Sequence, residues 1–379
     1  MKLFFKKHIP FVVMTSLLLL LIIFLIVIQI LKQNPAIAES WTRTFTRSYT
    51  EAFGKANENI VFSVTEVSFI VSIISCSVFL AWGFCCIGER KVWAGIHKFL
   101  MVTLVIVGTI TMYSATVGVA YNRKPLYLAT YRGEVKKEDL QGIASYFVDD
   151  FNKCAEHMKY DDQGNLIMPY SKDTLIYKLR DEFSRLPNNG YYNAYIPRAK
   201  EMMTSGIFTA FGIVGVYFGV LGEANYSSYA TPSEAPFYIC HELAHGAGAM
   251  REDDAQLVAT YLTLTSEDEF IRYSCYFNTI DRILDLARNS DNPNAYKELT
   301  AKMDNKIWKN YSLVYQHWKG KTFVADIGDK INDWYLKSFG QKEGTSSYND
   351  TETEIDDGKI YLSHYQGIYV KQYYDANKS

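Results

Sequence analysis

The sequence lacks the signatures of several common protein classes. It has six cysteines but no Cys-x-x-Cys pair, which argues against a cysteine zinc site or a dense disulfide framework. The scattered Cys154, Cys240 and Cys275 leave room for one disulfide. Lys and Arg (39) do not outnumber Asp and Glu (41), so no basic field is present to neutralise phosphates, and we expect no nucleic-acid partner. No Gly-x-Ser-x-Gly elbow and no phosphate loop occur, so serine-hydrolase and nucleotide-binding functions have no support.

Long apolar runs, in contrast, are abundant in the first 120 residues. Runs at about 9–31, 60–84 and 99–120 contain one charged residue between them, Glu66. Each is long enough to cross a bilayer, which takes about 20 residues. The first run exceeds the ~7–15 residues of a signal-peptide core. We therefore predict that residues 1–120 form a membrane anchor of three transmembrane helices.

The cationic residues near these runs predict the orientation of the chain. They lie before the first run and between the second and third, and are Lys2, Lys6, Lys7, Arg90, Lys91 and Lys98. Such residues favour the cytoplasmic side, whereas the loop at 32–59 mixes both signs and is expected outside. A cytoplasmic amino terminus and three spans place residues from about 121 onward outside the plasma membrane.

A fourth apolar stretch, residues 206–222, has two interpretations. It reads GIFTAFGIVGVYFGVLG, is uncharged, and falls just short of the ~18 residues of a span candidate. Its five glycines favour a strand or a pair of strands that packs beside the motif of residues 241–245 described below. A fourth span would instead return the following residues to the cytoplasm.

The remaining chain is predicted to be an α+β domain at 121–350, mainly helical with a small sheet. Apolar residues recur at helical spacing in 138–160, 171–186 and 252–264, and Ser171 is a suitable cap for the second of these helices. Residues 351–379 are polar and tyrosine-rich without a long periodic segment, so a polar C-terminal tail is expected.

One motif in this domain carries chemistry, His241-Glu242-Leu243-Ala244-His245. Histidines four apart on a helix project from one face, about one turn apart, and can share a metal ion. Glu242 lies beside the first histidine, where it can take a proton from water and pass it to a leaving amine. Zinc accepts this set of nitrogen and oxygen ligands, so Zn²⁺ is the expected cofactor.

The third ligand is expected in the first turn of the next helix, which begins with Glu252, Asp253 and Asp254. Glu252 is preferred, because Glu-x-x-Ala followed by an amide or an acid is typical of gluzincin peptidases. The two aspartates remain alternatives, and acids favour a helix amino terminus even without a metal. Gln256, one turn later, could hydrogen-bond a histidine ligand.

Beyond this motif, the chain resembles the bacterial membrane family known as domain of unknown function 3810. The matching residues are Arg198-Ala199-Lys200, Gly222-Glu223-Ala224-Asn225, Pro236-Phe237, the stretch 241–245, Arg251 to Gln256, Arg272-Tyr273-Ser274, Asn332-Asp333, Tyr335-Leu336-Lys337, Gln341, Gly344 and Ser347-Tyr348. The resemblance covers most of the chain to about residue 350 and implies a gluzincin-like metallopeptidase fold without a substrate. Two residues depart from the expected pattern, Gln256 in place of Asn and Gly246 in place of Gln.

The resemblance also indicates residues that would contact substrate. Glu223 and Asn225 are expected on the edge-strand side of the cleft, where a substrate backbone would pair by strand addition. The transition-state oxygen needs a hydrogen-bond donor, and Tyr273, Arg272 and Tyr348 are equal candidates.

The function expected from these features is a zinc-dependent peptidase that acts on peptides or proteins at the outer face of the membrane. An intramembrane-type protease is one alternative, but it requires residues 206–222 to span, and the charged residues 251–254 argue against it. A catalytically silent receptor or scaffold is another alternative. The presence of Glu242 argues against that alternative, because a binding-only site needs no base.

Overall fold

The computed structural model describes residues 2–124, 126, 135–341, 343–349, 354–356 and 359–377. The chain divides into two compact units. The first, here called the membrane unit, comprises Met1–Lys124 together with Phe218–Glu223. The second unit comprises Pro125–Tyr217 and Ala224–Ser379. The sequence boundary expected near residue 120 thus has a counterpart at 124, and one short segment from later in the chain belongs with the membrane unit.

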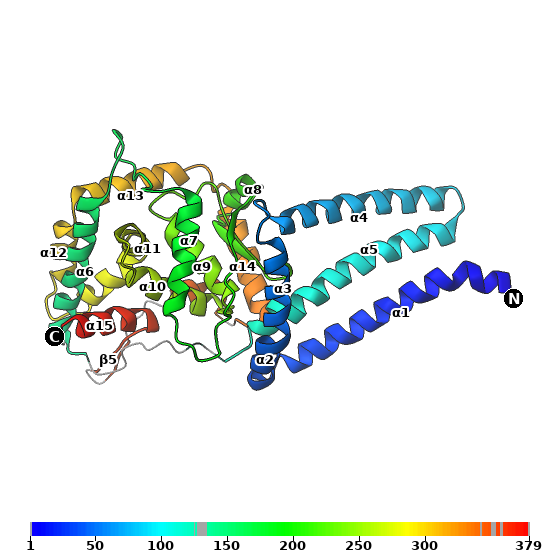
Figure 1. Ribbon diagram of the computed structural model, residues 1–379, viewed down its shortest axis with the longest axis horizontal. Helices are drawn as coiled ribbons and strands as arrows, with labels where there is room; N and C mark the ends of the chain where they lie inside the picture. The colour runs from blue at the N-terminus through cyan, green and yellow to red at the C-terminus, as the bar shows by residue number, and fades with distance from the viewer. Residues whose placement is uncertain are drawn as a thin grey trace. The chain divides into compact units, whose positions relative to one another are not determined.

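The membrane unit is helical (Figure 1). Its elements are α1 (Lys2–Leu31), α2 (Pro35–Trp41), the π-helical turn η1 (Thr42–Thr46), α3 (Arg47–Asn57), α4 (Val64–Gly88), α5 (Val92–Tyr113) and the π-helical turn η2 (Ser114–Gly118). Helix α5 packs against both α1 and α4. Residues 32–59, expected as a loop, are therefore largely helical.

Three helices of this unit are long and apolar enough to cross a membrane, as predicted: Ile9–Leu31, Val64–Gly88 and Val92–Gly118. The second begins four residues later than the expected run because the Ser63 side chain caps it, accepting a hydrogen bond from the Glu66 amide at 3.2 Å. The third begins seven residues earlier because α5 includes the polar residues His97 and Lys98. An apolar run marks the membrane-embedded part of a helix, whereas capping decides where the helix starts.

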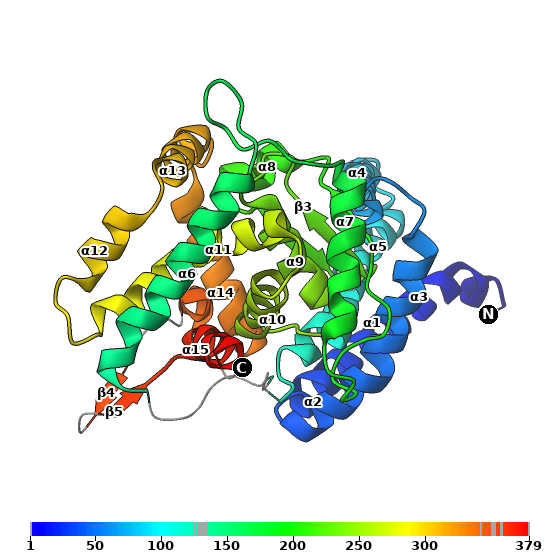
Figure 2. The same cartoon turned by 60° about the vertical axis from the view of Figure 1, so that its left-hand side comes forward.

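The second unit is mainly helical with a small sheet, as expected (Figure 2). Its elements are α6 (Lys137–His157), α7 (Lys172–Glu182), η3 (Phe183–Arg185), β1 (Ala199–Glu201), α8 (Ser205–Ala210), β2 (Gly215–Phe218), β3 (Glu223–Tyr226), α9 (Ala235–Gly246), α10 (Glu252–Leu264), α11 (Glu269–Arg288), α12 (Ala295–Lys302), α13 (Asn305–Trp318), α14 (Ala325–Phe339), η4 (Gly344–Asn349), β4 (Glu354–Asp356), β5 (Lys359–Tyr361) and α15 (His364–Ala376).

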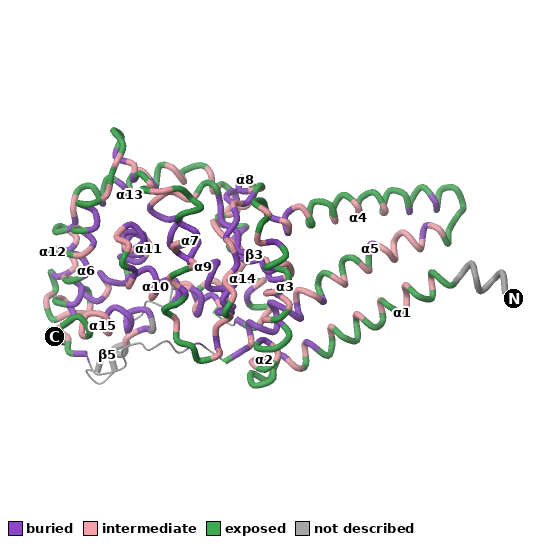
Figure 3. The backbone as a smooth tube through the Cα atoms, in the orientation of Figure 1, coloured by how far each residue is buried: buried purple, intermediate pink, exposed green. Residues whose placement is uncertain are grey.

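The core of the second unit is built around α11, which packs against α6, α9, α10 and α15. The predicted apolar face of α6 is buried. From it, Phe151 packs edge-on against Tyr273 of α11, with ring centroids 5.1 Å apart. Cys154, Cys240 and Cys275 are also buried, and each is a free thiol rather than half of a disulfide. Figure 3 shows the contrast between this buried interior and the exposed surface of α1 and α4.

Residues 206–222 do not form a fourth span. They divide between α8 and β2, and only the three helices named above qualify as spans in the described part of the chain. The sheet has the order β1-β3-β2, with β1 and β3 parallel and Ala199 opposite Ala224. Gly212 has φ +79°, so the chain turns between α8 and β2 in a conformation that glycine readily adopts. The strand interpretation was therefore right for β2 but missed α8.

The C-terminal residues are not simply a polar tail. Strands β4 and β5 pair antiparallel, and α15 follows with a capping box formed by Ser363 and Gln366. Tyr365 and Tyr369 of α15 are fully buried, and the Tyr369 hydroxyl hydrogen-bonds Thr279 at 2.6 Å. A tyrosine ring can fill a core while its hydroxyl finds a polar partner, which is why this segment reads as polar from its sequence.

Candidate metal centre

Helix α9 presents the two histidines of the motif. Pro236 lies in its first turn, where a proline costs no hydrogen bond, and the Phe237 amide donates to Ser274 Oγ at 3.1 Å. His241 and His245 then lie on one face, with ring centroids 4.8 Å apart. Both side chains are buried. The helix therefore offers two imidazoles to a common point inside the second unit.

A five-residue connection returns the chain from α9 to α10. Gly248 adopts φ +100°, and Asn193 Nδ2 donates to the Gly246 carbonyl at 2.8 Å. A Cβ at position 246 would lie 2.6 Å from two ring carbons of Pro197. The departure from the expected Gln at this position thus has a steric reason, because this approach of Pro197 leaves no room for a side chain.

Glu252, the first residue of α10, completes a group of three side chains that could hold a metal ion. Its Oε2 lies 3.2 Å from His241 Nε2 and 3.4 Å from His245 Nε2. The three ligand atoms lie within 4.8 Å of one another. Two ligands at zinc's usual bond lengths in a tetrahedral site are about 3.3–3.4 Å apart. The two histidine–carboxylate distances therefore match two edges of such a site.

The two aspartates that follow Glu252 are engaged elsewhere. Asp253 forms an ion pair with Arg251 at 2.6 Å. Asp254 accepts hydrogen bonds from the Leu126 amide at 2.9 Å and from the Tyr191 hydroxyl at 3.2 Å. Of the three candidates for the third ligand, the fold thus brings Glu252 to the histidines.

Contacts behind the histidines orient their rings. His245 Nδ1 donates to the Ala249 carbonyl at 2.9 Å, which orients the ring so that Nε2 is directed toward Glu252. The Gln256 side chain interacts with the His241 ring and acts to raise its pKa, although Nδ1 of His241 has no partner at strict hydrogen-bond geometry in the described residues. Gln256 therefore lies near a histidine, but the expected hydrogen bond to that ring is not formed in the described residues.

The electrostatics of the cluster are those of a tightly coupled buried set. Burial acts to raise the pKa of Glu252, but the charges and hydrogen bonds of His245 and His241 outweigh it and hold that pKa well below the usual range. Burial acts to lower the pKa of His245, and the Glu252 carboxylate reverses this and raises it to about 9. Burial lowers the pKa of His241 despite the Glu252 hydrogen bond. The carboxylate is thus stabilised as an anion, chiefly by the positive charge of His245.

Glu242 lies beside the cluster without being part of it. Burial raises the pKa of its carboxyl to about 8, against the opposing charge of His245. Its Oε2 has no hydrogen-bond partner among the described residues. A Cβ at Gly215 of strand β2 would overlap Glu242 Oε1. The absence of a side chain at position 215 therefore makes room for the Glu242 carboxylate.

The three candidates for the transition-state donor separate clearly. Tyr348 lies at the cluster, because its ring centroid is 6.3 Å from that of His241, and burial and the nearby Glu252 carboxylate raise the pKa of its hydroxyl well above the ordinary value. Tyr273 is fully buried in the core, with its hydroxyl bonded to Asn310 at 3.3 Å. Arg272 donates to the Ser266 carbonyl at 2.7 Å. The hypotheses for Tyr273 and Arg272 fail because α11 turns both toward other partners.

The expectation that Glu223 and Asn225 border the cleft from an edge strand is also wrong. Glu223 belongs to the membrane unit, where its carboxylate accepts hydrogen bonds from the amide and hydroxyl of Thr65, each at 2.7 Å, and from the Val64 amide at 3.2 Å. It thereby satisfies amides that the first turn of α4 leaves unpaired. Asn225 is fully buried on β3, which is the central strand of the sheet.

Several residues near the cluster carried no signal in the sequence. Gly215 was one glycine among five in an apolar run, and Pro197 lies outside every motif. The ring of Tyr217, on β2, lies 6.2 Å from that of His245. Gln341 Oε1 accepts a hydrogen bond from the Glu252 amide at 3.3 Å. Gln341 was part of the family resemblance, but nothing in its local sequence indicated a contact 89 residues away.

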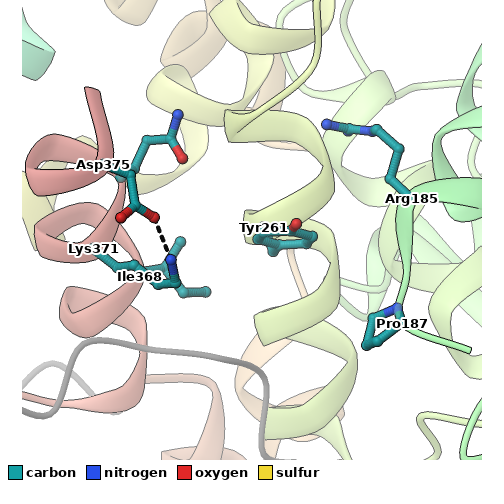
Figure 4. A pocket seen from close by; sticks show the side chains of 7 residues that line it. Arg185, Pro187, Tyr261, Ile368, Lys371 and Asp375 are labelled. Carbon is teal, nitrogen blue, oxygen red and sulfur yellow. Dashed lines mark hydrogen bonds and ion pairs between the residues drawn. The ribbon is translucent and has the colours of Figure 1, made fainter. Parts of the chain in front are cut away.

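A separate cleft of about 270 Å³ lies elsewhere in the second unit (Figure 4). Its lining comprises Arg185, Pro187, Tyr261, Ile368, Lys371, Gln372 and Asp375. The charges around it are already paired, since Lys371 bonds Asp375 and Arg185 donates to the Leu262 and Thr265 carbonyls. The cleft shares no residue with the histidine cluster.

Comparison with known proteins places the chain in a family without assigning it an activity. No curated protein and no solved structure matches it. A family model described as "Protein of unknown function (DUF3810)" matches residues 41–352. That range includes the second and third spans and the whole histidine cluster. Because the match extends over most of the chain, this protein belongs to the DUF3810 family.

Proposed function

We propose that this protein is a gluzincin-like zinc metallopeptidase, anchored in the bacterial plasma membrane by three spans, that hydrolyses peptide bonds at the outer face. The observation that carries the proposal is the cluster of His241, His245 and Glu252, in which both histidine–carboxylate distances suit tetrahedral zinc, with Glu242 beside it. Two neutral nitrogens and one carboxylate, with a fourth position for water or substrate, are a common set of ligands in catalytic zinc sites.

The chain's own groups supply the remaining chemistry. Zinc, when bound, polarises the scissile carbonyl and lowers the pKa of the attacking water. Glu242 accepts the proton of that water and passes it to the leaving amine, for which its free Oε2 is available in the described structure. Burial and the Glu252 carboxylate raise the pKa of Tyr348 well above its ordinary value. Its hydroxyl therefore stays protonated and can donate a hydrogen bond beside the metal.

Strand β2 is the element best placed to hold a peptide. It is an edge strand of the three-stranded sheet, and Gly215 brings its backbone against the Glu242 carboxylate. An extended peptide that pairs with an edge strand gains main-chain hydrogen bonds independent of its side chains. A peptide on β2 would pass Glu242, so β2 takes the role that the sequence had suggested for Glu223 and Asn225.

A pair of substitutions tests the roles of the two glutamates. Glu242→Gln keeps the size of the side chain but removes the base, so zinc affinity should persist while hydrolysis falls by at least ~10²–10⁴-fold. Glu252→Gln replaces a zinc ligand with a poor one, so affinity and activity should fall together. The measurements are the zinc content of the purified full chain and a comparison of the membrane and surface peptides of cells carrying each variant.

The two variants can also contradict the proposal. Loss of zinc in Glu242→Gln with retention in Glu252→Gln would reverse the assigned roles. If wild type and Glu242→Gln yield identical peptides and identical self-cleavage products under every condition, a receptor or scaffold that retains the fold replaces the peptidase.

The proposed orientation has its own test. A cysteine in place of the exposed Ser346 should react with a membrane-impermeant thiol reagent in intact cells. The unmodified chain, with its six native cysteines, is the control. Labelling above the control only after lysis would place the second unit in the cytoplasm.

A further inference from the structure

Helix α14 and the turn η4 connect to the ligand cluster through Gln341, which the proposed mechanism does not use, and through Tyr348, for which it uses only the hydroxyl. Helix α14 ends at Gly340, which adopts φ +109°, and the Gln341 amide then bonds the Leu336 carbonyl at 3.1 Å. Gln341 is 2% exposed. The helix terminus thus fixes the backbone of a buried glutamine that points toward α10.

The turn η4 is held against α14 by a second set of contacts. The Thr345 amide donates to Asp333 Oδ1 at 3.3 Å, and a Cβ at Gly344 would overlap the same oxygen. Ser347 Oγ donates to the Gly344 carbonyl at 2.7 Å. From the far side, Arg282 donates to the Tyr348 carbonyl at 3.0 Å. These contacts fix the position of Tyr348, and Asn332 of α14 also hydrogen-bonds its side chain.

Gln341, which follows α14, and Tyr348, in η4, both lie beside Glu252. Gln341 Oε1 accepts the hydrogen bond of the Glu252 amide at 3.3 Å. Glu252 begins α10, and amides in the first turn of a helix have no carbonyl of the same helix in reach. Arg251, which precedes it, gives no side-chain cap. The Tyr348 ring lies 6.3 Å from the His241 ring, and burial together with the neighbouring Glu252 carboxylate raises the pKa of the Tyr348 hydroxyl well above its ordinary value. One residue thus holds the backbone of the ligand and the other lies beside its side chain.

Packing alone does not account for the glutamine. Its Nε2 is buried without a partner in the part of the chain that the structure describes, and an unsatisfied buried donor reduces stability. An apolar residue of the same shape would avoid that loss but could not accept from Glu252. We propose that Gln341 and Tyr348 are positioning residues that hold Glu252 in place for the metal and so set the zinc affinity of the site.

This inference rests on the proposed zinc site, and its test uses zinc itself as the probe. Zinc affinity is measured on the full chain in detergent micelles by competition with a chelator. The variants are Gln341→Met and Tyr348→Phe. Their matched controls are Gln316→Met and Tyr315→Phe on the exposed face of α13. Each positioning variant should weaken zinc binding by about 10–100-fold, the usual cost of removing a partner of a ligand, and each control should bind as wild type does.

A second background distinguishes positioning from a general loss of structure. In Glu252→Ala the residue being positioned is absent, so Gln341→Met and Tyr348→Phe should cause no further loss of the remaining zinc affinity. Wild-type affinity in both single variants would overturn the proposal. An equal fold loss with and without Glu252 would overturn it as well, because the effect would not act through that ligand.

A metal-free measurement keeps this test independent of the proposed function. In chelator-treated protein, hydrogen exchange at the Glu252 amide should be faster in Gln341→Met than in Gln316→Met. If wild type binds no zinc, the metallopeptidase proposal fails while this exchange still reports on the contact. Unchanged exchange in Gln341→Met would show that Gln341 does not hold Glu252.

Discussion

The two units of this protein depart from the usual distribution of side chains in opposite ways. In the membrane unit, apolar side chains are exposed. Only 6% of the residues in the apolar segment of the first span, and 11% of those in the second, are buried. In the second unit, ionisable side chains are inside: His241, His245, Glu242 and Glu252 are each at most 8% exposed. Soluble domains normally bury the former and expose the latter.

Each departure indicates a partner of matching chemistry. Exposed apolar surface costs about 25 cal/mol per Å² in water, so helices of this length are stable only where hydrocarbon surrounds them. Buried charges are costly unless they are paired or bind a metal. The same chain therefore contains two regions that each need another component. The apolar helices of the membrane unit need a bilayer and, as we propose, the buried cluster of the second unit needs a cation.

The largest effect is expected from substitutions in the buried cluster of the second unit. His241→Ala and His245→Ala each remove a proposed ligand, so each should weaken zinc binding by more than the ~10–100-fold that an outer partner costs. His157→Ala is the control, because this histidine is half exposed and pairs with Glu269 outside the cluster. Metal analysis of the purified full chain decides the result, and retention of zinc in both variants would remove the metal from the proposal.

A charged residue introduced into the exposed apolar surface of α1 tests whether this helix needs a bilayer around it. Leu20 lies mid-way along the first span and is 63% exposed. Leu20→Arg should disfavour insertion of that span by about 3–4 kcal/mol, the difference between the insertion free energies of Arg and Leu at a helix centre. Glycosylation sites on either side of α1, in a translation system with membranes, report the inserted fraction. Tyr177→Arg, at a 72% exposed position of α7, should change nothing, and failure of the unmodified α1 to insert would show that α1 does not span.

A smaller effect is expected from filling the space beside Glu242, the proposed base. Gly215→Ala places a methyl group where Glu242 Oε1 now lies, and should displace the carboxylate rather than the ligands. We expect turnover to fall about tenfold or more, in line with the cost of a small misplacement in an active site, with zinc affinity near that of wild type. Gly142→Ala is a matched control, since a Cβ there meets nothing within 4 Å. Equal turnover in both variants would contradict the assigned position of Glu242.

The smallest effect concerns a polar pairing in the membrane unit. Burial acts to raise the pKa of Glu39, but hydrogen bonds from Arg123 and Arg43 outweigh it and lower the pKa to about 2, from 4.5. A depressed folded-state pKa contributes stability above the unfolded value and loses it as pH falls through the folded value. Wild type should therefore be modestly more stable than Glu39→Gln above about pH 4.5, and the difference should vanish near pH 2. Thermal unfolding of the detergent-solubilised chains against pH measures this, and a pH-independent difference would rule out the ionised pairing.

Local patterns were sufficient for much of the architecture. A span needs only a run of apolar residues, so three helices could be predicted from composition along the chain. Helix α10 at Glu252–Leu264 agrees with its predicted bounds, because capping and periodicity are properties of neighbouring residues. For the same reason, the four-residue spacing of His241 and His245 is enough to predict that both lie on one face of a helix.

Predictions were incomplete or wrong where a local sequence pattern is compatible with two different structures. Residues 206–222 are apolar and glycine-rich, but whether they span or fold back depends on what they pack against, and they form α8 and β2. The tyrosine-rich C-terminal residues have no clear period, yet α15 is buried. Tyrosine counts as polar in a pattern and behaves as a large apolar group in a core.

The sequence by itself determined the membrane helices, the helical motif and the set of residues that could complete it. Only the tertiary structure showed that Glu252 rather than Asp253 or Asp254, and Tyr348 rather than Tyr273 or Arg272, lies beside the histidines. It alone placed Glu223 at the start of α4. The physical reason is the range of the forces involved. Periodicity and capping act over a few residues, whereas the choice between neighbouring carboxylates depends on contacts with side chains far away in the sequence, such as Gln341, which no local pattern records.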